Sequence, residues 1–173
     1  MARVEYNFDE VSSFIKRLKQ AAKGDFEKEV TLFFEGLGAK LLRIVQDEII
    51  RRKVVDARLL LASFQEGGED NVWEISDGGL TLEVGTNVKY AAYANDGHWT
   101  NPKGVESRFV PGEWKGDRFI YMPGAKTGMV LKQKWVEGAH YWESAIRIFE
   151  KIYPEIIEKK MQKWFNDYFG EFN

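Results

Sequence analysis

Residues 26–52 read FEKEVTLFFEGLGAKLLRIVQDEIIRR. Apolar side chains recur in this stretch at steps of three and four residues, which is the spacing of one face of an α-helix. The spacing predicts one long amphipathic helix from Phe26 to about Arg52. Gly36 and Gly38 lie inside this helix, where each glycine costs about 1 kcal/mol relative to alanine. Two interpretations stay open: a tolerated glycine pair, or a place where another element comes close.

Shorter helical patterns flank the long one. Asp9 and Asp56 can each cap a short helix, the first ending near Gly24 and the second before Gly67. The first sixty residues are therefore expected to be helical.

After these helices, the spacing of apolar residues changes from the helical three or four to the every-second-residue spacing of a strand. Apolar and polar side chains alternate from Val72 to Ser76 and again from Leu80 to Val84. Residues 76–79, Ser-Asp-Gly-Gly, supply a turn between the two runs. This pattern predicts a β-hairpin.

Residues 95–128 contain three of the four prolines, and only residues 119–122 read as a strand. We therefore expect a long loop excursion here, of the kind that usually has a function. Helical spacing returns after Gly138 and continues to Tyr168. Pro154 either begins a separate final helix or kinks a continuous one.

Together these patterns predict an α+β fold. A long N-terminal helix and a C-terminal helix are expected to pack on one face of a small, mostly antiparallel sheet, with a long loop excursion. At 173 residues and 44% hydrophobic content, residues 1–173 are expected to form a single domain with one core. Within it we expect an N-terminal helical segment (1–24), a core (25–100 and 132–173) and a loop insertion (101–131).

Composition excludes several classes of protein. The formal net charge of −2 leaves no general excess of positive charge for a phosphate backbone, so no specific nucleic acid is expected as a partner. The absence of cysteine excludes disulfides, thiolate zinc sites and thiol nucleophiles. The first ten residues carry acids where a secretory signal needs an apolar stretch, and no run approaches the roughly 20 apolar residues that span a bilayer. We expect a protein made inside the cell, without membrane insertion.

Charge is distributed unevenly along the chain. The formal charges of residues 1–60, 61–100, 101–135 and 136–173 are +2, −6, +4 and −2. Blocks of opposite sign fit either an internal pairing of the two middle segments or contact with a neighbouring copy.

Few residues suit catalysis. A metal site of Asp96, His98 and His140 is conceivable, but nothing in the sequence fixes their mutual spacing. No serine lies in a glycine-flanked nucleophile turn, and no Gly-Lys-Ser/Thr phosphate loop is present. The sequence therefore predicts no enzyme, with no catalytic residues, no cofactor and no metal.

Aromatic and basic side chains alternate through residues 99–135. Such side chains can stack on bases or sugars, but they are also the types enriched at the centres of protein interfaces. We favour the interface. Its candidate residues are His98, Trp99, Arg108, Trp114, Arg118 and Trp135.

Residues 84–98, VGTNVKYAAYANDGH, carry a family resemblance. They resemble the signature of the tail-completion or neck proteins of tailed bacteriophages related to minor tail protein Z, a family also found in defective prophages of Gram-positive bacteria. Residues 56–64 and 135–138 resemble the flanking stretches, although Ala57-Arg58 stands where the family usually has Thr-Gly. The resemblance covers about residues 25–170 and departs at residues 103–131, which look like an insertion.

The resemblance implies a structural, non-enzymatic virion protein that assembles as a homo-oligomeric ring at the head-proximal end of the tail. Its partners would be further copies of itself and other tail and head–tail connector proteins. It would be made in the host cytoplasm and then reside in the tail or neck of the virion. The alternative is an enzyme or nucleic-acid-binding module that uses Asp96, His98 and the basic aromatic loop 101–135.

The signature residues are expected to have structural roles. Gly85 would end a strand, Gly97 would let the backbone turn, and Tyr90 and Tyr93 would pack on the long helix as core residues. The full set is Gly85, Thr86, Asn87, Tyr90, Ala91, Tyr93 and Gly97.

Overall fold

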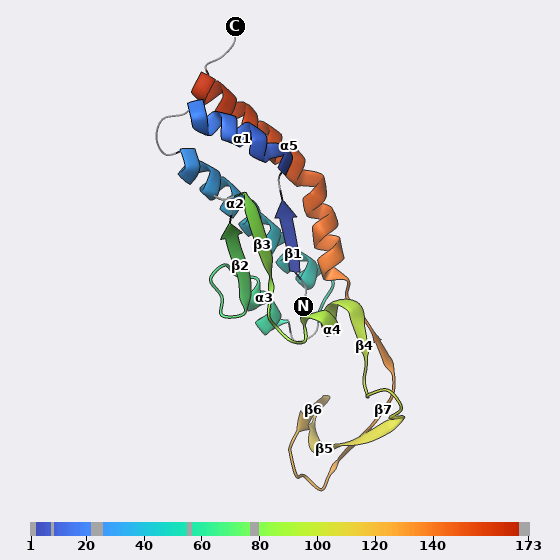
Figure 1. Cartoon of the computed structure of the whole chain (residues 1–173). Coiled ribbons are helices and arrows are strands. Elements are labelled where there is room, and N and C mark those ends of the chain that lie inside the picture. The colour runs from blue at the N-terminus through green and yellow to red at the C-terminus, as the bar shows by residue number, and fades with distance from the viewer. Residues whose placement is uncertain (1–2, 8, 22–25, 55–56, 77–79, 170–173) are drawn as a thin grey trace. The chain divides into compact units, whose positions relative to one another are not determined.

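The computed structural model describes residues 3–7, 9–21, 26–54, 57–76 and 80–169 (Figure 1). The chain divides into two compact units. We call the first, residues 1–95 and 139–173, the body, and the second, residues 96–138, the arm.

The elements confirm the predicted α+β class. The body contains β1 (Arg3–Asn7), α1 (Asp9–Ala21), α2 (Phe26–Arg51), α3 (Arg58–Ser63), β2 (Asn71–Ser76), β3 (Thr81–Thr86), α4 (Ala91–Asp96) and α5 (Tyr141–Phe169). The arm contains β4 (Gly97–Trp99), β5 (Ser107–Lys115), β6 (Arg118–Tyr121), β7 (Gly128–Lys132) and β8 (Trp135–Glu137). All strand pairs among the described residues are antiparallel.

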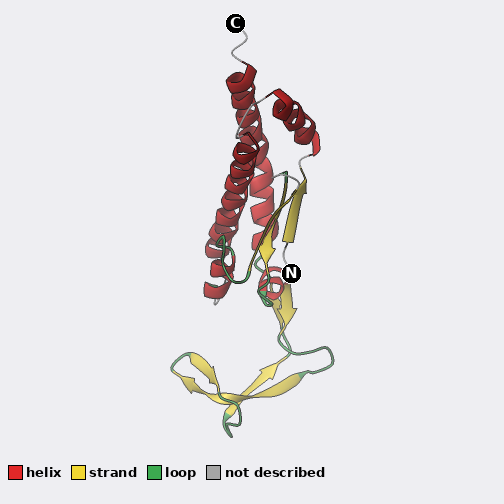
Figure 2. Ribbon diagram, turned by 60° about the vertical axis from the view of Figure 1, so that its left-hand side comes forward, coloured by secondary structure: helices red, strands yellow, loops and turns green. Residues whose placement is uncertain are grey.

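Helix α2 confirms the long helix that residues 26–52 predict. Its buried face follows the apolar spacing and forms the largest contribution to the core. This helix and α5 pack against each other along their lengths, as Figure 2 shows. The buried apolar residues of α2 are Phe26, Val30, Phe34, Leu37, Leu41, Leu42, Val45 and Ile49.

The sheet of the body has the strand order β1-β3-β2. Register places Val4, Val84 and Trp73 in one row across the sheet, and Tyr6, Leu82 and Ile75 in the next row on the same face. All six pack in or against the hydrophobic core, so this face is the one that the helices cover. The predicted hairpin is confirmed as β2 and β3, while residues 77–79 of its turn lie outside the described residues.

Helix α5 is continuous from Tyr141 to Phe169 with Pro154 inside it, so Pro154 does not begin a separate helix. Trp164, near its end, is fully buried and meets the rings of Phe26 and Phe33 on α2. Its indole N–H donates to Glu29 Oε2 at 3.0 Å. The second half of the helix therefore continues because its apolar face packs on α2 beyond the proline.

The prediction that the first sixty residues are helical is wrong at β1. Residues 3–7 alternate in polarity over only five positions, and their strand partner β3 lies more than seventy residues away. Such a short run is not specified locally, because an isolated strand gains its hydrogen bonds only from a partner.

Helix α3 is not capped as the sequence predicted. Ala57 occupies the N-cap position and provides no side-chain cap, and Asp56 lies outside the described residues. The Tyr90 hydroxyl instead accepts a hydrogen bond from the Leu60 N–H at 3.1 Å. A residue thirty positions away thus satisfies one of the free N–H groups in the first turn.

The two glycines of α2 have different surroundings. A methyl group added at Gly36 would meet no atom within 4 Å. One added at Gly38 would lie 2.6 Å from the Trp73 ring and 2.7 Å from Leu82 Cδ2. Gly38 therefore permits close approach of the sheet, and Gly36 is the tolerated glycine.

This difference predicts opposite effects of the same substitution. Gly36→Ala should raise the free energy of unfolding by up to about 1 kcal/mol, because alanine has the higher helix propensity. Gly38→Ala should lower it by up to about 2 kcal/mol, since overpacking costs about 1–3 kcal/mol and the propensity gain offsets only about 1 kcal/mol of that cost. Chemical denaturation of both variants checks the prediction, and a stabilised Gly38→Ala would contradict the packing of α2 on the sheet.

Candidate functional site

The arm has no apolar core of its own. All of its residues are described, and none of their apolar side chains is buried. Several are more than half exposed, among them Trp114 at 59%, Tyr121 at 61% and Val130 at 65%. The exposed large apolar residues of the arm are Trp99, Phe109, Trp114, Tyr121, Met122, Val130, Trp135 and Val136. Concentrations of exposed apolar side chains mark interaction sites in folded proteins.

The arm is built of strands, which corrects the loop predicted for residues 101–131. Strand β5 pairs with β7 through residues 107–111 and with β6 through residues 112–115. Pro111 and Gly112 lie in the middle of β5, and both residue types weaken the strand signal in a sequence. The loop prediction failed at this point.

Two glycines of the arm allow aromatic rings to lie on the backbone of a neighbouring strand. A methyl group added at Gly112 would lie 2.7 Å from the Phe119 ring, and one at Gly128 would lie 2.5 Å from the Phe109 ring. Cross-strand contacts of this kind help to hold β5 against β6 and β7 without a core.

Polar side chains hold the base of the arm together. The Thr100 N–H donates to the Lys134 carbonyl, and the Thr100 hydroxyl donates to the Lys132 carbonyl and accepts from the Lys134 N–H. Asn101, only 2% exposed, donates from Nδ2 to the Leu131 carbonyl at 2.9 Å. Sequence reasoning missed Thr100 and Asn101. Their one local signal is that short polar residues before Pro102 favour turns.

The six predicted interface residues all lie in the arm, in separate clusters. Trp99 and Trp135 are cross-strand partners whose ring centroids are 5.4 Å apart, and His98 lies beside them opposite Val136. Trp114 forms a second ring pair with Phe119, at 5.3 Å. The two predicted arginines are exposed: Arg118 lies opposite Lys115, and Arg108 reaches the Thr100 carbonyl at 3.4 Å.

The exposed set is wider than the sequence predicted. The sequence prediction did not include Phe109, Tyr121, Met122, Val130 and Val136. A segment interpreted as a loop gives no indication of which side chains share one side of a sheet. Period-two spacing of Phe109 and Pro111, or of Val130 and Lys132, becomes informative only once the strands are known.

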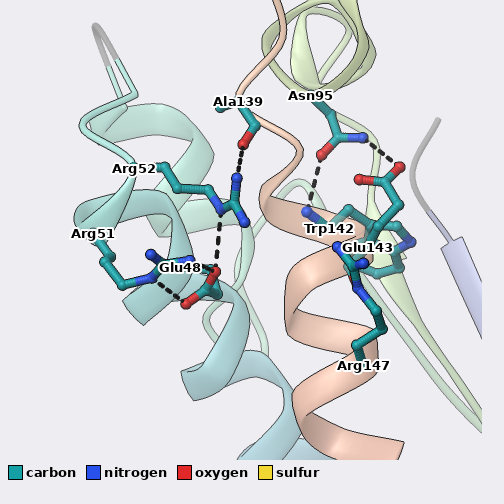
Figure 3. A network of polar contacts seen from close by, with 8 residues as sticks. All are labelled: Glu48, Arg51, Arg52, Asn95, Ala139, Trp142, Glu143 and Arg147. Carbon is teal, nitrogen blue, oxygen red and sulfur yellow. Dashed lines mark hydrogen bonds and ion pairs between the residues drawn. The ribbon is translucent and has the colours of Figure 1, made fainter.

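A polar network within the body joins the segment that precedes the arm to the segment that follows it (Figure 3). The Ala139 N–H donates to the Ala94 carbonyl, and the His140 N–H donates to the Asn95 carbonyl. The Asn95 side chain, 3% exposed, accepts from the Trp142 N–H and donates to Glu143 Oε1. Asn95 thereby caps the first turn of α5 from another element.

The other half of this network centres on Glu48. The Arg51 guanidinium donates to both carboxylate oxygens of Glu48, and Arg52 adds a third bond at 3.2 Å. These hydrogen bonds, chiefly those from Arg51, lower the pKa of Glu48 to about 2 despite its burial. Arg52 also donates to the Ala139 carbonyl at 2.7 Å, so the ion cluster holds the body segment that follows the arm.

The signature residues mostly hold the end of the sheet. Thr86 is fully buried; its hydroxyl donates to Ser63 Oγ and accepts from the Val88 N–H. Asn87 accepts from Arg3. Strand β3 runs through Gly85 to Thr86, one residue beyond the predicted end. Ala91 is buried in α4, and Gly97 has the positive φ of 89° expected of a turn glycine.

The two tyrosines of the signature differ. Tyr90 packs against the core, as expected. Tyr93 is 60% exposed, so its prediction as a core residue is wrong. The i, i+3 relation applies to two residues of the same helix, and α4 begins only after Tyr90.

The exposed aromatic and basic side chains of the arm are of the types found at protein interfaces. Among the described residues, no three His, Asp or Glu side chains lie close enough together to hold a metal ion. A groove of about 570 Å³ in the body is lined by Arg3, Trp142, Glu143 and Arg147 among others, with no nucleophile beside a base. No helix of the described chain combines the length and the apolar character that a membrane span requires.

Comparisons with known proteins agree on one group. The family model described as "Bacteriophage HK97-gp10, putative tail-component" matches residues 12–97. The phage-like element PBSX protein XkdI of Bacillus subtilis (strain 168) is 46% identical over 147 residues, which are 85% of this chain and 90% of XkdI. The uncharacterized protein YqbI of the same strain is 45% identical over 162 residues, 92% of this chain and 97% of YqbI. No solved structure matches. The family model ends where the arm begins, whereas both relatives match more residues than the body contains and so share part of the arm.

Proposed function

Because this chain belongs to the HK97-gp10-like family of bacteriophage tail components, we propose that it is a tail-completion or neck subunit that forms a ring at the head-proximal end of the tail. Its partners are further copies of itself and the adjoining tail and connector proteins. It is made in the host cell and then becomes part of the virion.

One observation carries the proposal: the arm exposes eight large apolar side chains and buries none. A folded segment of this kind is stabilised when a partner covers it. Tryptophan and arginine dominate the binding energy of many interfaces. Three of the eight side chains are tryptophans, and Arg108 and Arg118 of the arm are exposed as well.

The decisive experiment is deletion of the gene from a particle-producing strain. Electron microscopy should then show heads and tails that are not joined, or tails with an incomplete upper end. Expression of the wild-type chain in trans should restore joined particles. Normal particles in the deletion strain would contradict the proposed function.

His98 is the residue for which the structural and the enzymatic hypotheses predict different effects of substitution. Trp99→Ala should weaken self-association about tenfold or more, because it removes one ring of the exposed Trp99–Trp135 pair. His98→Ala should weaken it no more than Trp99→Ala does. Sedimentation velocity across a concentration series measures both.

Tyr93→Ala is the matched control, since Tyr93 is an equally exposed aromatic residue of the body. It should leave self-association unchanged. Stoichiometric binding of zinc or manganese that disappears in His98→Ala would contradict the proposal and favour an enzyme.

A further inference from the structure

The outer face of the body sheet carries a row of three carboxylates. Register places Glu5 on β1, Glu83 on β3 and Glu74 on β2 directly opposite one another. Their side chains point away from the core, because the neighbouring rows Val4–Val84–Trp73 and Tyr6–Leu82–Ile75 point into it. Like charges that lie directly opposite across strands destabilise a sheet.

Cations of the body neutralise this row only in part. Arg3 Nη1 lies 3.1 Å from Glu83 Oε1. Glu5 and Glu74 are both exposed, and neither forms an ion pair with a described residue. Two negative charges on this face therefore have no counter-ion within the described part of the chain.

Apart from Arg3, the described side chains that flank the glutamates on this face are small or β-branched. The row on one side of the glutamates is Arg3, Gly85 and Val72, and the row on the other side contains Thr81 and Ser76. In Figure 1 the three strands lie in front of α2, and no described helix covers their near side. A second layer of strands can approach such a surface at the usual sheet-to-sheet distance of about 10 Å.

The arm carries a complementary surface. Lys115 and Arg118 lie directly opposite each other at the end of the β5–β6 hairpin, so they also form a like-charge pair. Lys115 has one loose contact, 3.6 Å to Glu113. Lys132 on β7 and Arg108 on β5 add exposed positive charge to the same arm. Glu113 and Arg3 offset part of the repulsion on the two surfaces, and contact between the surfaces would offset the rest.

We infer that the acidic outer face of the sheet, defined by Glu5, Glu74 and Glu83, is the docking surface for the arm of a second copy, through Lys115 and Arg118. One surface of the chain then meets a different surface of the next copy, which is the head-to-tail arrangement that closes into rings. The inference rests on the proposed function and adds the surface that receives the arm.

Charge reversal in the purified full-length chain tests the inference. The arm variant carries Lys115→Glu and Arg118→Glu, and the sheet variant carries Glu5→Lys and Glu74→Lys. All four side chains are exposed, so both variants should unfold cooperatively near the wild-type temperature. By sedimentation velocity, each variant alone should self-associate at least about tenfold more weakly than the wild type.

An equimolar mixture of the two variants should recover association to within about threefold of the wild type. In the mixture, a reversed arm meets a reversed sheet, and a wild-type arm meets a wild-type sheet, so every contact pairs opposite charges. Glu155→Lys with Glu158→Lys, two exposed acids on α5, is the control of equal charge change and should associate like the wild type.

A mixture that stays dissociated, or a sheet variant that associates like the wild type, would overturn the inference. A changed sedimentation coefficient at unchanged monomer mass would also overturn it, since it indicates that the arm pairs with its own body. If wild-type association depends on Trp99 but not on these charges, the inference fails and the proposed function stands. A wild-type chain that stays monomeric overturns the inference, while particle assembly in the deletion strain tests the function separately.

Discussion

Replacing residues 97–137 by a short glycine-serine linker should abolish self-association and incorporation into particles while the body still folds cooperatively. The body keeps its core because every buried apolar residue lies outside the arm. The linker has little distance to cover, since the Ala139 and His140 N–H groups bond to the Ala94 and Asn95 carbonyls. Thermal unfolding followed by circular dichroism should show one transition within a few degrees of the wild type.

The control for this replacement is Asn95→Ala in the full-length chain. It leaves the arm intact but removes the cap on α5, leaving the buried Trp142 N–H without its acceptor. This should lower the free energy of unfolding by about 1–3 kcal/mol. The two variants therefore separate loss of the arm from loss of stability. A linker variant that unfolds without a cooperative transition would show that the arm is part of the core.

Trp164→Ala should cause the largest loss of stability from a single substitution, about 3–5 kcal/mol in the free energy of unfolding. The Trp164 side chain is fully buried between α2 and α5. It meets the rings of Phe26 and Phe33, and its N–H donates to Glu29. Lys160 Nζ also lies 4.9 Å from the centre of its ring. Urea denaturation measures the loss.

Two further substitutions test how much of this stability loss comes from the hydrogen bond to Glu29 and how much from burial of the ring. Trp164→Phe keeps a ring in the cavity and removes the bond to Glu29, so it should cost about 1–2 kcal/mol. Trp114→Ala makes the same side-chain change at a site that is 59% exposed in the arm, and it should change stability by less than about 0.5 kcal/mol. Equal losses in Trp164→Ala and Trp114→Ala would contradict the packing of α5 on α2.

The signature stretch shows how far a local motif can be interpreted. The sequence of residues 84–98 was enough to indicate the family, and the matches to XkdI and YqbI confirm it. It could not show that the Tyr90 hydroxyl caps α3 or that Thr86 bonds to Ser63, because both partners lie more than twenty residues away. The same limit applies to Asn95, whose two partners are on α5.

The sequence by itself determined the helices and the hairpin. Helix α2 and the two halves of α5 repeat their apolar residues every three or four positions, and a helix satisfies its hydrogen bonds within that same stretch. Only four residues separate β2 from β3 in the sequence, so their pairing is nearly local as well.

Only the tertiary structure decided the role of β1, the continuity of α5 across Pro154, and the strands of the arm. It also decided which charges face one another, since the row of Glu5, Glu83 and Glu74 joins residues from three separate strands. The physical reason is the same in each case. A strand forms its hydrogen bonds with residues that are distant in sequence, and many side chains contact such residues too. A local sequence pattern therefore does not predict which partners meet.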